Sequence, residues 1–220
     1  MSLLFDHVFT FVAEDGPEAG LLEGAGLTIG ATQLLRGQGT ASRSDLFDGN
    51  FLELVHLHSR AEAEADPMRL DRRADFAKTG CCPYGIGLRG RLSEAERGRF
   101  LPYHPPYFPA GAVLWIHRAT TDDPALPLVF VSEPWPGFTV ETMRPGGWPR
   151  IPRTRFEHAC GATGIADVRM TLPSVRGWPL EPPVPGVSVS AGERFHLSVA
   201  LAGARFAPLA LDPWVEVVAA

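Results

Sequence analysis

The stretch LFDHVFTFVA, residues 4–13, decides the fold, and GNFLELVHLH, residues 49–58, has a similar pattern of residues. Both are dense in aromatic and branched apolar residues, which is typical of a strand covered on both faces. Each strand also contains a polar residue where an apolar one would pack better, His7 in the first and Glu53 in the second. Because burying such groups costs free energy, the pair points to a functional site.

One helix and two further strands are expected between these two stretches. Acidic residues around Pro17 are followed by apolar residues and two glycines, which indicates a short helix with a glycine stop. Good turn sequences, RGQG and DGN, separate the strands that follow. The first unit is therefore predicted to be βαβββ, with its elements at residues 3–12, 13–26, 27–35, 40–48 and 51–59.

The rest of the chain is richer in proline and predicts short strands joined by loops. Residues 60–80 are polar and form a connecting segment that is partly helical. A helical turn follows with Ser93 and Glu96 as a capping box, and Ala191 and Gly192 offer a two-residue hairpin turn. The whole is α+β and dominated by antiparallel sheet, with later strands at residues 81–92, 111–119, 126–135, 161–173, 187–203 and 212–220.

Composition excludes several classes of protein. The 220 residues are 45% hydrophobic and carry a formal net charge of −5, so no basic field exists to hold a nucleic acid. No apolar run reaches the roughly 18 residues of a membrane span, and the N-terminus lacks the pattern of a secretory leader. Three cysteines, two of them adjacent, do not form a disulfide framework, which favours a reducing cytoplasm.

With a histidine on its first strand and a glutamate on its last, the first unit resembles the vicinal oxygen chelate superfamily, which includes glyoxalase, extradiol dioxygenases and fosfomycin-resistance proteins. Within that superfamily the chain is similar to glyoxalase-like domain proteins of unassigned activity. The likeness is carried, in order over most of the chain, by LFDHVFTFV (4–12), GQGTASRSDLFDGNFLELV (37–55), CPYGIGLRG (82–90), HPPYFPAG (104–111) and EHACGATGIADVRM (157–170).

The resemblance implies paired βαβββ modules that form a cupped, mainly antiparallel sheet in one domain. Residues 1–60 would be the first module, 61–80 a connecting segment and 81–220 a divergent second module with Pro-rich loops. It also implies a divalent metal in the cup, Zn, Mn, Ni or Fe, with His7 and Glu53 as ligands. Strand alternation agrees, since it places each of the two among large apolar side chains. Without a metal, Glu53 could pair with an arginine and His7 could simply be hydrogen-bonded in the core.

The second module does not supply its expected first-strand ligand, because CPYGIGL contains no His, Gln or Glu. A mononuclear site needs at least three protein ligands and an open position. His158, just before a glycine-rich entry to a strand, is the candidate for the third ligand. The alternative for His158 is an exposed loop position.

Other residues are expected to bind the substrate in the cup. Arg43 would orient a carboxylate or a similar anion. His117 shares a strand face with Trp115 and either lines the pocket or lies on a half-exposed face. The apolar wall is assigned to Phe9, Phe51, Tyr84 and Trp115.

Two functions follow from these residues. The first is a metal-dependent enzyme of the lyase, isomerase or dioxygenase type acting on a small oxygenated molecule, with Glu53 as general base if no ion is bound. The second is a metal-free protein of the bleomycin-resistance type that binds or sequesters a small molecule, which the missing ligand favours. Because members of the superfamily often dimerise, a homodimer is a further expectation.

Overall fold

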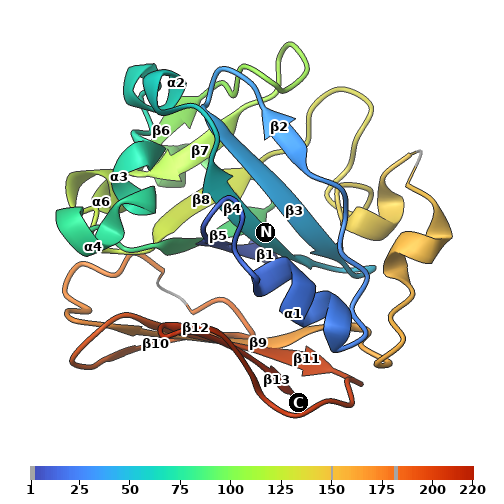
Figure 1. Ribbon diagram of the computed structural model, residues 1–220. Helices are drawn as coiled ribbons and strands as arrows, with labels where there is room; N and C mark the ends of the chain where they lie inside the picture. Colours follow the sequence, from blue (N-terminus) through green and yellow to red (C-terminus); the bar gives the residue numbers. More distant parts are fainter. Residues whose placement is uncertain (1–2, 150, 181–182) are drawn as a thin grey trace.

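The computed structural model describes residues 3–149, 151–180 and 183–220, and its strands form two stacked sheets (Figure 1). One sheet has eight strands and the other has five. Most neighbouring strands are antiparallel. The helices are few and short, which confirms the expected α+β class of paired modules with a loop-rich second half.

The first unit has the expected βαβββ order. Its long strands form at the residues that the sequence favours, and α1 ends beside Gly26, whose φ of 89° is the left-handed conformation that glycine adopts readily. The elements are β1 (Leu4–Phe11), α1 (Glu18–Gly24), β2 (Gln33–Leu35), β3 (Thr40–Leu46) and β4 (Phe51–Leu57).

A second set of four strands completes the larger sheet. Its strands are β5 (Tyr84–Arg89), β6 (Phe100–Tyr103), β7 (Leu114–His117) and β8 (Leu128–Ser132). The strand order is β2-β3-β4-β1-β5-β8-β7-β6, so the two sets meet at the antiparallel pair of β1 and β5. In each set the first strand pairs in parallel with the last, β1 with β4 and β5 with β8.

Short helices connect the strands of the larger sheet. The predicted capping box forms at α5, where Ser93 and Glu96 each bond the other's backbone N–H. The segment between the two sets is helical in part, as expected. The helices are α2 (Arg60–Ala65), α3 (Leu70–Ala74), α4 (Phe76–Thr79), α5 (Glu94–Arg97) and α6 (Arg118–Asp122). Among the described residues, no helix has both the length and the apolar character to cross a membrane.

The strands beyond β8 form the separate five-stranded sheet, drawn in orange and red in Figure 1. They are β9 (Gly164–Leu172), β10 (Val187–Ala191), β11 (His196–Ala202), β12 (Leu209–Asp212) and β13 (Val215–Ala219). The expected hairpin at Ala191 and Gly192 is wrong, because β10 and β11 lie on opposite sides of β9 and do not pair with each other. Two 3-10 turns, η1 (Pro145–Gly147) and η2 (Arg153–Phe156), precede this sheet.

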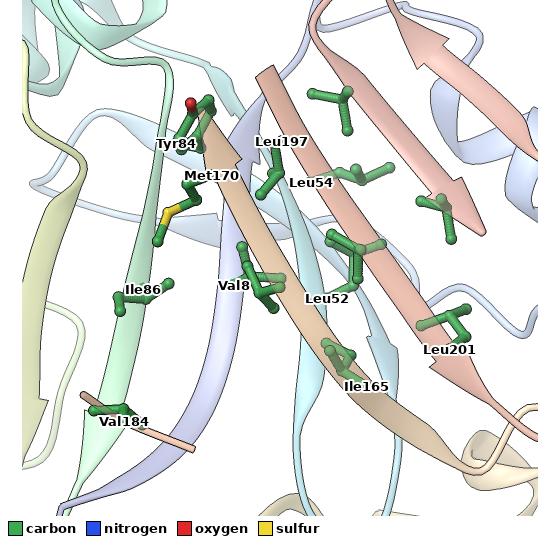
Figure 2. Packing of buried hydrophobic residues seen from close by; sticks show 14 of the residues in the cluster. Val8, Leu52, Leu54, Tyr84, Ile86, Ile165, Met170, Val184, Leu197 and Leu201 are labelled. Carbon is green, nitrogen blue, oxygen red and sulfur yellow. The ribbon is translucent and has the colours of Figure 1, made fainter. Parts of the chain in front are cut away.

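The main core fills the space between the two sheets (Figure 2). Val8 and Leu52 of the larger sheet lie opposite Ile165 and Leu201 of the smaller one, and all four are buried. Side chains alternate along a strand, so burying Val8 in this layer turns His7 and Phe9 to the opposite face of the larger sheet. That opposite face is where the cup forms.

Candidate functional site

A cavity of about 450 Å³ opens on the face of the larger sheet that points away from the second sheet. This volume lies within the usual range of small-molecule sites. Much of the lining comes from β1, β4, β7 and β8 and from the loop after β8, and the rest comes from β2, β3, β6 and the segments that connect the strands. The expected residues His7, Phe9, Phe51 and Glu53 all line it.

Aromatic rings make up much of the cavity wall. The His7 imidazole stacks on Phe51 with 4.2 Å between ring centroids, and Phe51 meets Trp148 edge to face at 5.5 Å. Across the cavity, Trp135 lies 5.5 Å from Phe108 and 5.1 Å from Phe138. The loop from β8 to η2 therefore supplies three aromatic side chains of the wall, none of which the sequence had assigned to the site.

A line of polar groups runs into this apolar cup from behind β1. Nη1 of Arg89 lies 2.9 Å from Oδ1 of Asp6, and Oδ2 of Asp6 lies 2.8 Å from Nδ1 of His7. Nε2 of His7 then lies 3.9 Å from Oε2 of Glu53 on β4. Because an ionised carboxylate only accepts hydrogen bonds, Nδ1 of His7 carries the proton and Nε2 of the neutral ring keeps its lone pair on the side of Glu53.

An irregularity in β1 is what allows two consecutive residues to share this site. The pairing of β1 with β5 shifts between Phe5 and His7, so Asp6 lies in a bulge and also lines the cavity. In a regular strand Asp6 would point with Val8 into the core between the sheets. Nη1 of Arg89 further donates to the carbonyl oxygens of Phe5 and Gly49, which fixes the bulge.

Two glycines on β5 make room for the rings of β1. A methyl group added at Gly87 would overlap Cε1 of His7 and lie 2.6 Å from its Nδ1. A methyl group at Gly85 would lie 2.6 Å from Cε1 of Phe9. The alternating glycines of YGIGLR thus form a backbone floor on which the two rings rest.

A second polar chain closes one side of the cup near Glu53. Nε2 of Gln38 donates to the hydroxyl of Tyr103 at 3.2 Å and to that of Tyr107 at 3.4 Å. The Tyr103 hydroxyl donates in turn to Asp66 at 2.8 Å. Burial and, secondly, the charge of Glu53 raise the pKa of the Tyr107 phenol. Burial also raises the pKa of Tyr103, so both tyrosines are neutral hydroxyl groups at neutral pH.

Two residues expected to bind the substrate lie on the other face of the sheet. Arg43 donates to Oε1 of Glu23 at 2.6 Å and to the carbonyl oxygen of Gly30, so it braces α1 and does not reach the cup. Tyr84 is fully buried between the sheets, where its hydroxyl donates to the carbonyl oxygen of Thr171. The structure brings neither of them to the cavity.

The two expected residues of β7 also face away from the cavity, which their strand neighbours Leu114 and Ile116 line instead. The Trp115 indole donates to Oε2 of Glu133 at 3.2 Å. Nδ1 of His117 accepts the N–H of Ala119 and caps α6. Trp115 and His117 do share a face, as the sequence indicated, but it is the face opposite the cup.

His158 is buried behind β3, not exposed on a loop. Its Nδ1 accepts the N–H of Thr28 at 3.1 Å, and its Nε2 donates to the carbonyl oxygen of Leu46 at 3.1 Å. Burial lowers the pKa of this imidazole. Beside it lies Asp45, whose carboxyl oxygens have no hydrogen-bond partner among the described residues and whose pKa burial raises to about 8.

The described residues of the cup offer fewer donors than a metal ion requires. Among the described residues, no group of three His, Cys, Asp or Glu side chains is arranged to hold one. The strand pairing equates His7 with Gly87 and Glu53 with Ser132, because His7 pairs with Phe51 as Gly87 pairs with Phe130. The two halves thus offer two strong donors where a mononuclear site needs three.

Several residues of the site escaped the sequence analysis. Asp6 stands next to His7, but alternation assigns neighbouring residues to opposite faces. Arg89 is the one charged residue of YGIGLR, which was a usable signal. Trp148 and the other aromatic residues of the loop gave none, since nothing in a Pro-rich loop indicates where it folds back.

Comparisons with known proteins give likenesses of fold. No model of a known protein family matches the chain, and no curated protein matches it. The chain is similar to the solved structure of a hypothetical protein from Staphylococcus aureus, with a TM-score of 0.53, 13% identity and 99% of each chain covered. At that identity the likeness establishes a shared fold and nothing more.

Two further solved structures match part of the chain. One is methylmalonyl-CoA epimerase from Mycobacterium tuberculosis, a vicinal oxygen chelate protein, with a TM-score of 0.39 and 15% identity over 60% of this chain and 88% of that one. The other is a hypothetical protein from Bacillus halodurans, with a TM-score of 0.41 and 15% identity over 63% of this chain and 99% of that one. At TM-scores below 0.5 these partial likenesses carry no argument about activity.

Proposed function

We propose that this protein is an enzyme of the glyoxalase-like type that moves protons on a small oxygenated molecule held in the cup. The reaction would be an isomerisation or an elimination, since both need a proton taken from one atom and a proton given to another. The observation that carries the proposal is the line from Arg89 through Asp6 to His7, which directs Nε2 toward Glu53 inside an aromatic cavity.

His7 is the group best placed to take the first proton. Asp6 holds its Nδ1–H, which sets the tautomer and stabilises the imidazolium that forms when Nε2 accepts a proton. Stacking on Phe51 fixes the plane of the ring. Positioned acid–base groups of this kind contribute about 10² to 10⁴ in rate.

Glu53 is the second proton-handling group of the proposal. Its carboxylate lies on the neighbouring strand, 3.9 Å from Nε2 of His7, so one small substrate can touch both groups. The largely apolar lining lowers the local dielectric and so strengthens the electrostatic interactions between these groups and the substrate. In this proposal Glu53 acts as a general base, the role that the sequence suggested for it in the absence of an ion, or as the matching acid.

A metal-dependent reaction does not fit the described donor set. His7 and Glu53 could each ligate a divalent ion, but His158 is engaged behind β3 and the equivalent positions of the second strand set are Gly87 and Ser132. We expect protein purified without an affinity tag to bind less than about a tenth of an equivalent of Zn²⁺, Mn²⁺, Ni²⁺ or Fe²⁺. Stoichiometric metal lost in both His7→Ala and Glu53→Ala would restore the metal-dependent alternative.

A metal-free binding protein is the second candidate function, because a largely apolar lining rich in aromatic rings suits retention of an apolar molecule without chemistry. Proton exchange separates the two functions. The protein is incubated in D₂O with a panel of small aldehydes, ketones and hydroxy ketones, and deuterium incorporation is followed by NMR. An enzyme exchanges protons of at least one compound, whereas a binding protein broadens ligand signals without exchange.

Matched variants assign the exchange to the cup. We expect His7→Gln and Glu53→Gln each to reduce it by about 10²-fold or more. The controls His58→Gln and Glu23→Gln make the same changes at exposed side chains outside the cup and should leave it unchanged. Exchange that survives in both cup variants would refute the proposal.

A further inference from the structure

The side chains that face the cavity include acidic groups but no lysine or arginine among the described residues. The acidic residues that line it are Asp6 and Glu53. The charge of Asp6 is taken up by Arg89 behind the strand, at 2.9 Å. Oε2 of Glu53 lies 3.9 Å from Nε2 of His7, beyond hydrogen-bonding distance, and no described lysine or arginine lines the cavity, so the Glu53 carboxylate has no close counter-charge there.

The surfaces around this carboxylate are aromatic. Phe51 and Trp148 stand on the side of His7, and Trp135 and Phe138 extend from the loop after β8. The face of an aromatic ring carries negative electrostatic potential and attracts cations, most strongly when water is excluded. A carboxylate and several ring faces in one cavity thus combine two features that both favour positive charge.

The same features disfavour an anionic ligand. A carboxylate or phosphate in this cavity would lose its hydration and meet Glu53 without a lysine or arginine among the described lining residues to compensate. Arg43, which the sequence suggested for this task, is engaged with Glu23 on the opposite face.

We propose that the natural ligand of the cup is an organic cation, a protonated amine or quaternary ammonium group attached to an apolar body. The positive group lies near Glu53 and the rings of Phe51 and Trp148, while the apolar body fills the space toward Trp135. The inference rests on the proposed function only in using the same site, because the charge preference holds whether the cup catalyses a reaction or only binds.

Three compounds of nearly equal shape test the preference: phenyltrimethylammonium, its uncharged isostere tert-butylbenzene and the anion 4-tert-butylbenzoate. Calorimetry on the whole chain gives the dissociation constant of each. We expect the cation to bind at least about tenfold more tightly than the isostere, and the anion most weakly. Equal or tighter binding of either competitor, or no binding of the cation up to millimolar concentration, overturns the proposal.

Variants locate the origin of the preference. Glu53→Gln should reduce the advantage of the cation over the isostere to about threefold or less, leaving the isostere's own affinity unchanged. Glu23→Gln, which makes the same charge change at an exposed residue, should leave the tenfold advantage intact. An advantage that persists in Glu53→Gln refutes the role of the carboxylate.

Of the arginines that adjoin lining residues in sequence, those among the described residues do not line the cavity, namely Arg36, Arg43, Arg69 and Arg144. Arg150 lies outside the described residues, between Pro149 and Ile151, so the three compounds are also measured on Arg150→Gln. The order of affinities should be the same as in the wild type. If the wild type bound the anion and Arg150→Gln lost that binding, the proposal would be overturned.

The outcome is separable from that of the proton-exchange assay. Loss of the cation preference together with exchange that depends on His7 overturns the ligand class alone. A clear cation preference without exchange of any compound overturns the enzymatic function alone.

Discussion

At the scale of single residues, Asp6 and Arg89 decide what His7 can do. Their side chains are about one tenth exposed and form a close ion pair at 2.9 Å, which the low exposure makes sensitive to loss of either partner. The pair also explains why the bulge in β1 is tolerated, since it brings the Asp6 carboxylate within 2.8 Å of Nδ1 of His7.

Asp6→Asn should weaken both the fold and the proposed activity. We expect the free energy of unfolding to fall by about 3 kcal/mol, because Arg89 is left buried without its counter-charge. Proton exchange should fall by about 10²-fold or more, since an amide does not hold the Nδ1–H tautomer as a carboxylate does. Chemical denaturation and the D₂O assay measure the two effects.

Asp48→Asn is the matched control for Asp6→Asn. It makes the same substitution in an exposed ion pair with Arg153 and should cost less than about 1 kcal/mol. Equal costs for the two variants would contradict the special role of the buried pair.

Asp45 provides a prediction about pH. Burial raises its pKa from 3.8 to about 8 in the folded chain, so between these values the unfolded chain releases a proton that the folded chain retains. The folded state is thus penalised as pH rises from about 4 to 8. Asp45→Asn should therefore stabilise the protein by roughly 1 to 3 kcal/mol at pH 8, with a gain that shrinks toward pH 4.

Thermal unfolding of wild type and Asp45→Asn across that pH range checks the sign. A gain that grows toward low pH would show that the carboxylate is ionised and stabilising in the folded chain. Asp122→Asn makes the same substitution at an exposed residue and serves as the control.

At the scale of elements, the junction of β1 and β5 builds the site. All six residues of β5 are buried, so the strand shows no alternation of polar and apolar residues from which its facing could be predicted. The two glycines that face the cup are what admit the rings of Phe9 and His7. The sequence of β5 contains no metal ligand, and the structure gives the physical reason: the imidazole of His7 occupies the space that a side chain at Gly87 would need.

Gly87→Ala tests this account of the junction. The added methyl group would overlap the His7 ring, so the ring must leave Asp6 and Phe51. We expect exchange to fall by about 10²-fold and the free energy of unfolding by about 1 to 3 kcal/mol, the usual cost of overpacking. Gly98→Ala, where the added methyl group meets only Ala95 O at 3.8 Å, should change neither.

If Gly87→Ala kept full exchange activity, the position of the His7 ring would not matter to the reaction. The junction would then be a packing device only, and the proposed role of Nε2 would be wrong.

At the scale of the whole molecule, the second sheet makes the first one possible. Residues such as Val8, Leu52 and Ile86 are fully buried only because β9 and β11 cover them. The cup faces the other way, so the larger sheet is apolar on both faces. One face packs against the second sheet, and the other lines the cavity.

A chain ending after residue 135 should therefore fail to fold, although it contains all eight strands of the larger sheet. Exposing the inter-sheet face removes the burial of several large side chains, each worth about 1.5 to 3 kcal/mol. We expect no cooperative thermal transition and strong binding of a hydrophobic dye. A cooperative transition in this fragment would show that the eight-stranded sheet is stable alone.

The expected homodimer stays a prediction, which light scattering of the whole chain would test.

The family resemblance implied that His7 and Glu53 meet in one site. Local patterns in the sequence determined the βαβββ order of the first unit, the capping box at α5, and which residues share a face within a strand, His7 with Phe9 and Glu53 with Phe51. These follow from short-range rules of strand alternation, turn chemistry and capping. Only the tertiary structure decided which pleat face of each strand meets the cup, and it turned Arg43, Tyr84, Trp115 and His117 away. Alternation divides a strand's residues into two sets, but which set faces a ligand depends on what covers the other. Here the second sheet covers one face of the larger sheet, so the other face forms the cup, and the bulge turns Asp6 toward it.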